Sequence, residues 1–237
     1  AAAERAGDFL LENLRNDEKR LYRTFKNGTA KLNGYLEDYC FTIEAFIQLY
    51  ESTFDKDWLE RAKALSDYCI QHFFDQKSGM FYFTSDEDPP LVARKMEVTD
   101  NVIPASNSSM AKALFKLGKL YDQQNYLAIS RQMIKNVYDQ VDTYGSAYSN
   151  WADVLLYHLF PFQEIAIAGK SAKQFRHEFG QYYLPNSLFC GTVSEENLPL
   201  LENKLVKGKT MVYVCVNKAC LLPVNSVNEA LEQVQVR

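Results

Sequence analysis

The sequence lacks several features that would place it in large classes of protein. Over its 237 residues no apolar run approaches the ~20 residues that a membrane-spanning helix needs, so we expect no membrane partner. Lysine and arginine are scattered rather than clustered, and the formal net charge is −4, so we expect no nucleic-acid partner. Residues 1–17 follow an amphipathic pattern instead of a basic start and an apolar core, so we expect no signal peptide there.

The sequence also lacks the common cysteine motifs. Five cysteines at irregular positions do not resemble a secreted disulfide framework, so we expect a cytoplasmic protein. Cys215 and Cys220 have C-x4-C spacing, whereas the redox motif is C-x-x-C and a zinc site needs a second pair of ligands nearby. Two interpretations of this pair stay open: structural cysteines, which the residues favour, and a bridge that forms under oxidation.

The glycine motifs that hold nucleotides are also missing. The residues "GKS" at 169–171 follow an expected strand, but a phosphate loop needs an earlier glycine where Glu164 stands. Ser171 is better explained as a helix cap. No dinucleotide-binding glycine pattern and no histidines at metal-ligand spacing occur in the sequence, so we expect no cofactor and no bound metal.

The first two-thirds of the sequence contains a repeated pair of helices. Residues 35–51 carry apolar side chains on nearly every side, which predicts a helix that is buried all round. Residues 57–74 carry them three or four positions apart, which predicts a helix with one buried face. The same pair recurs at about 104–121 and 125–141, and a third helix of the buried type begins near Ser149.

Alternating buried and one-faced helices predict an α/α toroid, in which the buried helices form the inner ring. Residues 1–16 predict the outer helix of a further hairpin. A complete six-hairpin ring needs roughly twelve helices, and the pattern supplies only part of them, so we expect a partial (α/α)6 toroid over residues 1–160. Its open apolar edge would need cover, either from a missing N-terminal part of a parent protein or from self-association.

The pattern changes after Pro161, where short apolar segments alternate with one-faced helices. We expect a small C-terminal α/β unit over residues 161–237. The predicted strands are residues 162–169, 186–193 and 210–216, and the predicted helices are residues 170–183 and 225–235.

Three blocks of the sequence carry a family resemblance. They are "GYLEDYCFTIEAFIQLYESTFDKDWLERA", "ARKMEVTDNVIPASNSSMAKALFKL" and "VYVCVNKACLLPV". In this order they resemble the YyaL-like family, which includes a spermatogenesis-associated mammalian protein, and the resemblance covers about residues 30–225. It implies an (α/α)6 toroid related in fold to N-acylglucosamine 2-epimerases and six-hairpin glycosidases. It also implies a preceding thioredoxin-like domain and early hairpins that have no counterpart in this chain.

In a toroid of this type, the N-terminal end of each inner helix and the loop before it face a funnel. We call each such end a mouth. The three mouths are "NGYLEDY", "RKMEVTDNVIPASNSS" and "YGSAYSNWAD", and they carry the acids, amides and aromatic rings that sugar recognition uses. The predicted acid/base residues are Glu37, Asp38 and Asp100. The predicted sugar-contacting residues are Tyr35, Tyr39, Arg94, Lys95, Asn101, Ser106, Asn107, Asn150 and Trp151.

The chemistry at these mouths stays open between two classes. Glycoside hydrolysis needs two carboxylates, ~5–5.5 Å apart for retention or ~6.5–9.5 Å for inversion, and Glu37 or Asp38 with Asp100 can supply them. Acids in the first turn of a helix also stabilise it by ~0.3–1 kcal/mol each without any ligand. The alternative function is therefore a non-catalytic binding or interaction module that serves a thioredoxin-like domain.

The positions of the three histidines argue against one further reaction. Epimerisation next to a carbonyl usually needs a histidine near neutral pKa at the site. His72 falls on an outer helix, His158 lies late in its inner helix and His177 falls in the C-terminal unit. The histidines therefore argue against a working 2-epimerase from this chain alone. If the chain is an enzyme, the expected reaction is glycosidase-like or sugar-epimerase-like.

Overall fold

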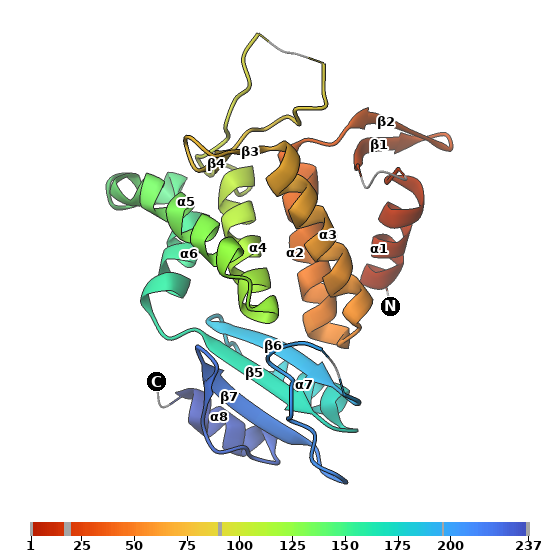
Figure 1. The fold of residues 1–237 in the computed structure, drawn as a ribbon, viewed down its shortest axis with the longest axis vertical. Helices are drawn as coiled ribbons and strands as arrows, with labels where there is room; N and C mark the ends of the chain where they lie inside the picture. Colours follow the sequence, from red (N-terminus) through yellow and green to blue (C-terminus); the bar gives the residue numbers. More distant parts are fainter. Residues whose placement is uncertain (1, 17–19, 90–91, 196, 236–237) are drawn as a thin grey trace.

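The computed structural model describes residues 2–16, 20–89, 92–195 and 197–235. They form a helical unit that lies on a small sheet, with the sheet at the lower end in Figure 1. The chain is mainly helical, as the sequence predicts. None of the helices in the described part of the chain is both long and apolar enough to cross a membrane.

Two helical hairpins form the centre of the helical unit. The first joins α2 (Leu36–Thr53) to α3 (Lys56–His72), and the second joins α4 (Ser106–Tyr121) to α5 (Gln124–Thr143). A short 3-10 turn (Gly145–Ala147) leads into α6 (Ser149–Leu159), and α1 (Ala2–Asn13) lies beside α2. The helices predicted from apolar periodicity are confirmed to within a few residues at each end.

The ends of α2 and α3 follow from local hydrogen bonds. The Asp38 carboxylate accepts a hydrogen bond of 2.8 Å from the Tyr35 N–H, which satisfies a donor at the start of α2. Phe54 ends α2 in the left-handed region at φ 53°, and its N–H donates to the Tyr50 carbonyl at 2.7 Å. Asp55 then caps α3 by accepting from the Asp57 N–H at 3.1 Å.

The helices α2, α4 and α6 form a row, and α3 and α5 cover α2 and α4 from outside (Figure 1). Helices α2, α4 and α6 all start at the end away from the sheet, so their mouths lie on the same side of the molecule. In α4 most residues are buried, as expected of an inner helix. In α6 only Trp151 and Val154 are buried, whereas Leu159 is 63% exposed, because α6 has neighbours on one side alone. The ring itself stays a prediction.

Two short antiparallel hairpins lie near the mouths. One pairs β1 (Tyr22–Lys26) with β2 (Thr29–Asn33), and the other pairs β3 (Phe74–Asp75) with β4 (Met80–Phe81). The second hairpin follows α3 directly in the sequence. The Leu36 N–H donates to the Phe83 carbonyl at 2.9 Å, which ties the segment after this hairpin to the start of α2.

The C-terminal unit is a four-stranded sheet in the order β6-β5-β7-β8. The central strand β5 (Gln163–Ala168) pairs parallel to β6 (Ser187–Thr192) and antiparallel to β7 (Met211–Val216). The short strand β8 (Ala219–Cys220) pairs with β7, and α7 (Ala172–Phe179) connects β5 to β6. All three long strands lie where the sequence predicts them.

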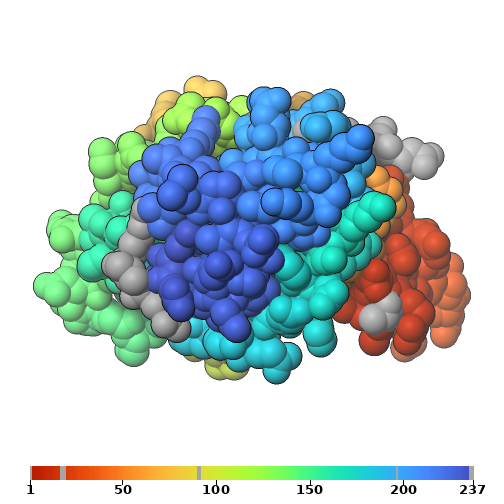
Figure 2. All heavy atoms as spheres, turned by 90° about the horizontal axis from the view of Figure 1, so that it is seen from below, coloured from red at the N-terminus to blue at the C-terminus, as the bar shows by residue number. Residues whose placement is uncertain are grey.

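The two faces of this sheet contact different partners. Ile165, Ile167, Val212 and Val214 pack in one core with α7 and α8 (Val227–Gln235). Ala166 and Cys190 belong instead to the large core of the helical unit. Figure 2 shows the C-terminal residues covering the lower face of the molecule.

Candidate functional site

The second and third mouths are joined by a buried carboxylate. Asp100 is 7% exposed, and its Oδ1 accepts hydrogen bonds from the Ala105 N–H at 2.8 Å and the Ser108 hydroxyl at 2.7 Å. Its Oδ2 accepts from the Asn150 N–H at 2.9 Å, and the Asn150 amide donates to the Ser108 oxygen at 2.9 Å. Asp100 therefore links the start of α4 to the start of α6, a contact that spans 50 residues of sequence.

Three further predicted residues use their polar atoms to hold backbone segments. The Trp151 Nε1 donates to the Val98 carbonyl at 2.7 Å. The Asn107 amide donates to the Phe81 carbonyl at 2.9 Å, and its oxygen accepts from the Phe81 N–H at 2.8 Å. The Tyr39 hydroxyl accepts from the Leu21 N–H at 2.9 Å. All three side chains are buried, so these contacts favour a structural role.

The first mouth holds its two acids against an arginine. Arg23, on β1, lies 2.6 Å from the Glu37 carboxylate and 3.0 Å from the Asp38 carboxylate through the same Nη1. Its guanidinium also lies 5.0 Å from the centre of the Tyr35 ring. The hydrogen bond to Glu37 raises the pKa of Arg23 above its usual value, so this cation stays charged. Arg23, which lies outside the mouth, therefore neutralises part of the negative charge of Glu37 and Asp38.

Arg94 and Lys95 lie in the loop that leads to the second mouth. The Arg94 guanidinium donates to the Thr84 carbonyl and, at 3.2 Å, to the His72 carbonyl. It also lies 4.1 Å from the centre of the Tyr82 ring. The Lys95 side chain is exposed, and its carbonyl accepts from the Phe83 N–H at 2.7 Å. Arg94 is thus bound to backbone, whereas Lys95 reaches solvent.

Asn101 and Ser106 complete the predicted set. Asn101 is exposed, and its N–H donates to the Ile103 carbonyl at 3.0 Å. Ser106 is fully buried, and its N–H donates to the Glu97 carboxylate at 3.0 Å. Within the described residues the Ser106 hydroxyl has no hydrogen-bond partner. Among the predicted residues, the Arg94 Nε is the other buried side-chain atom that has no hydrogen-bond partner within the described part of the chain.

Several cavities of the molecule lie away from the predicted residues. Five cavities among the described residues have volumes of about 290–740 Å³, and none of these five is lined by a predicted site residue. The second and third mouths are joined by hydrogen bonds between their own residues, whereas the acids of the first mouth pair with Arg23.

A polar stripe runs down the inner helices below the mouths. It consists of Glu37, Glu44, Gln48 and Glu51 on α2, Ser109, Lys112, Lys116 and Lys119 on α4, and Asp153 and Tyr157 on α6. Within each helix the members are three, four or seven residues apart, which places them on one face. Sequence analysis missed this stripe because apolar residues dominate these helices, yet the spacing of the few polar positions was a usable signal.

Ion pairs connect the stripe from helix to helix and on to the sheet. Lys112 lies 3.0 Å from Asp153, and Lys116 lies 3.0 Å from Glu51. Glu51 is 3% exposed and also accepts from the Phe189 N–H on β6 at 3.0 Å. Each of these charges therefore has a partner of opposite sign or a backbone donor.

Glu44 differs from the other acids of the stripe. It lines a cavity of about 290 Å³ between α2, α4 and α6, which we call the interhelix cavity, and its other lining residues are Ile47, Gln48, Lys112, Ala113, Lys116 and Tyr157. Burial raises the pKa of Glu44 to about 7, although Lys112 and Lys116 act in the opposite direction. No ion pair within 4.0 Å involves Glu44 among the described residues.

Such a carboxyl suits proton transfer at neutral pH. A general acid or base works best when its pKa lies near the operating pH, and Glu44 meets that condition. Gln48, the two lysines and the Tyr157 hydroxyl supply hydrogen-bond donors around it. Burial raises the pKa of Tyr157 to about 12, so its hydroxyl stays protonated. In the described part of the chain, no group of three or more histidine, cysteine or acidic side chains is placed to hold a metal ion.

No family model matches the chain, but comparison with known proteins finds relatives. The chain is similar to spermatogenesis-associated protein 20 of Rattus norvegicus, with 25% identity over 205 residues, which cover 81% of this chain and 26% of that protein. The human protein of that name is 24% identical over 203 residues, with the same two shares of 81% and 26%. An uncharacterised protein of Caenorhabditis elegans is 23% identical over 216 residues, which cover 87% of this chain and 29% of that protein.

These matches support the family link that the three sequence blocks predict. The chain spans about a quarter of the length of the curated relatives it matches, at 26% for the rat and human proteins. Their names state no ligand and no reaction.

Proposed function

We propose that this chain binds a carbohydrate or sugar-like metabolite at the interhelix cavity, with Glu44 as the group that exchanges a proton with it. The observation that carries the proposal is a carboxyl with a pKa of about 7 in a cavity that is also lined by one amide, two ammonium groups, one phenol and the apolar side chains of Ile47 and Ala113. A hydroxyl-rich ligand can accept from those donors and share a proton with Glu44.

The predicted toroid gives the cavity a place in a larger site. If α2, α4 and α6 belong to an inner ring, the polar stripe faces the ring axis and the mouths form its rim. Glu37 lies on the same face of α2 as Glu44, two turns nearer the rim. In this arrangement Glu37 and Glu44 are the two carboxylates that a glycosidase-like reaction would use. Asp38 and Asp100 would instead hold the rim in shape, because their oxygens are engaged by backbone donors.

The test is binding and turnover with a panel of neutral, acidic and amino sugars and their aryl glycosides. We expect at least one panel member to bind the 237-residue chain, as measured by calorimetry. Glu44→Gln should keep the shape of the side chain and lower turnover by roughly 10²–10⁴-fold, the usual contribution of a general acid or base. Glu12→Gln, on the exposed surface of α1, is the matched control and should behave as wild type.

If no panel member binds, the proposal fails. A sugar that wild type and Glu44→Gln bind and turn over equally well would place the site elsewhere on the molecule.

The second candidate function is a non-catalytic binding or interaction module. It is favoured by the engaged mouth acids and by an apolar strip at the open side of α6. Within that strip Leu156 is 43%, Leu159 63% and Phe160 57% exposed. Binding of a sugar with no turnover in wild type would support this candidate. Self-association measured by sedimentation, and lost in Leu159→Ser, would identify the strip as the covered edge.

A further inference from the structure

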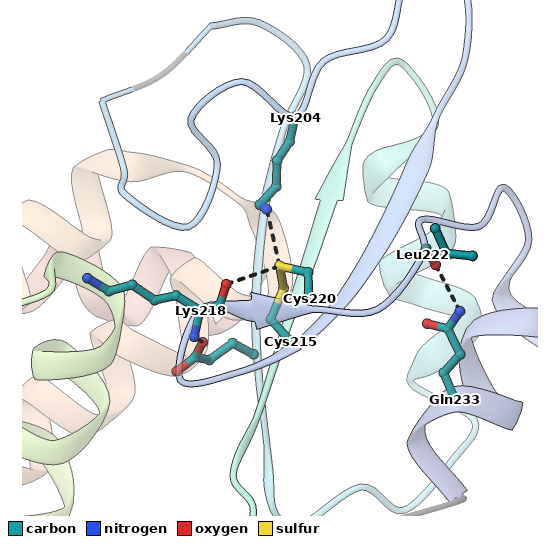
Figure 3. The surroundings of a disulfide bond; sticks show 7 residues. Lys204, Cys215, Lys218, Cys220, Leu222 and Gln233 are labelled. Atoms are coloured by element: carbon teal, nitrogen blue, oxygen red, sulfur yellow. Dashed lines mark hydrogen bonds between the residues drawn. A yellow bond between two sulfur atoms is a disulfide. The ribbon is translucent and has the colours of Figure 1, made fainter.

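The strands β7 and β8 form a tight hairpin that a disulfide closes (Figure 3). Cys215 and Cys220 are direct partners in the register of the two strands, and Asn217 and Lys218 form the turn between them. Both turn residues have positive φ, 49° and 66°, as a type I′ hairpin turn requires. The bridged state, which the sequence left open for this C-x4-C pair, is thus the one that the structure contains.

The two sulfurs of this bridge have different surroundings. Cys215 is fully buried against the sheet, whereas Cys220 is exposed on the edge strand. The Lys204 ammonium lies 3.4 Å from the Cys220 sulfur, and Figure 3 shows it pointing at that atom. An external thiol therefore meets Cys220 first.

Lys204 is held in this position by contacts of its own. Its ammonium lies 4.5 Å from the centre of the Tyr213 ring, and its carbonyl accepts from the Tyr213 hydroxyl at 2.9 Å. Burial lowers the pKa of Lys204, while the nearby Cys190 and Glu164 act to raise it. A positioned cation beside a sulfur favours the thiolate over the thiol, and the thiolate is the reactive form.

A purely structural role explains this bridge poorly. The cysteines are 5 positions apart in sequence, and a disulfide that closes so short a loop removes less entropy from the unfolded chain than one that closes a long loop. The hairpin is already fixed by its turn and by strand pairing. An exposed sulfur beside a lysine adds reactivity, which a structural bridge does not need.

We propose that Cys215 and Cys220 form a thiol–disulfide exchange site for an external dithiol, with Cys220 as the sulfur that the dithiol contacts. A thiolate of the dithiol attacks the Cys220 sulfur, a mixed disulfide forms there, and the S–S bond to Cys215 breaks. Cys215 leaves with the electron pair and takes up a proton. The second thiol of the dithiol then loses its proton and attacks the other sulfur of the same dithiol, which is bonded to Cys220 in the mixed disulfide. Cys220 leaves as a thiolate beside Lys204, and the dithiol is oxidised to a disulfide by two electrons.

The test uses dithiothreitol as the dithiol and the intact chain. We expect dithiothreitol to reduce the bridge under native conditions, with the circular dichroism spectrum of the helices unchanged. In the reduced protein, iodoacetamide should alkylate Cys220 faster than Cys215 at pH 7. Lys204→Met should slow that alkylation roughly tenfold and shift its pH profile upward by about one unit, since one pKa unit is a factor of ten. Lys207→Met, an exposed lysine of the same loop, is the control and should change neither.

A second pair of variants separates the roles of the two sulfurs. Cys215→Ser should form a stable mixed disulfide at Cys220 with Ellman's reagent, and Cys220→Ser should react far more slowly. A bridge that resists dithiothreitol until the chain unfolds would overturn the proposal. The proposal would also be overturned if iodoacetamide alkylated both cysteines at the same rate and Lys204→Met did not change the pH profile of that reaction.

Discussion

The replacement of Asp100 by asparagine tests whether the mouth acids build the fold or act on a ligand. The change keeps the shape of the side chain, and its oxygen can still accept from Ala105 and Ser108. Its amide nitrogen, however, replaces the Oδ2 that accepts from the Asn150 N–H, so two donors would face each other. Losing one hydrogen bond to a buried charge costs ~1.5–3 kcal/mol, and weakening the other two adds to this. We expect Asp100→Asn to lower the free energy of unfolding by about 2–4 kcal/mol.

The assay is urea unfolding followed by circular dichroism, with Ser108→Ala as the control. That variant removes a hydroxyl that donates to Asp100 and accepts from the Asn150 amide, so we expect a loss of about 1–2 kcal/mol. If Asp100→Asn changed the free energy of unfolding by less than about 0.5 kcal/mol and abolished sugar binding, a structural role for Asp100 would be refuted. Asp100 would then be the acid/base residue that the sequence predicts.

Three further outcomes follow from buried groups. The pKa of Glu44 is about 7 in the folded protein and 4.5 in the unfolded chain, so the stability that its protonated form contributes is lost as the pH rises between these values. The free energy of unfolding of wild type, measured with urea, should therefore fall by up to about 3 kcal/mol relative to that of Glu44→Gln between about pH 4.5 and pH 7. Glu51→Gln should lower the free energy of unfolding by about 3–5 kcal/mol, because it breaks a buried ion pair; equal stability of the two proteins would contradict this. Gly191→Ala should cost about 1–3 kcal/mol in thermal unfolding, because its Cβ would lie 2.3 Å from the Phe54 ring. Gly145→Ala, with open space around it, should be near neutral.

The helices and strands were predictable because their signals are local. The segment predicted as helix 35–51 is helical over Leu36–Thr53, since apolar spacing and the acids of the first turn both lie within it. The strands β5, β6 and β7 were found for the same reason, since each is a short apolar run between turn residues. Helix α6 was predicted in place, but its burial depends on neighbours that its own residues do not reveal.

The candidate site was less predictable, because its partners are far apart in sequence. The link between Asp100 and Asn150 crosses 50 positions, and the ion pair of Glu37 depends on Arg23 in a hairpin for which no strand was predicted. The C-x4-C pair needed the strand register before a bridge could be assigned. The polar stripe did have a local signal, the spacing of a few polar residues along apolar helices, but it was not predicted.

The energetics of the polar stripe bear on whether it has a function. Buried ion pairs contribute little net stability, because the attraction between the charges is offset by the loss of their hydration. Apolar residues at the positions of Glu51 and Lys116 would hold α2 and α4 together about as well. Burial raises the pKa of the Glu44 carboxyl to about 7, and this carboxyl forms no ion pair with the described residues. Stability alone gives no reason for an acid at that place, whereas a ligand that exchanges a proton with it does.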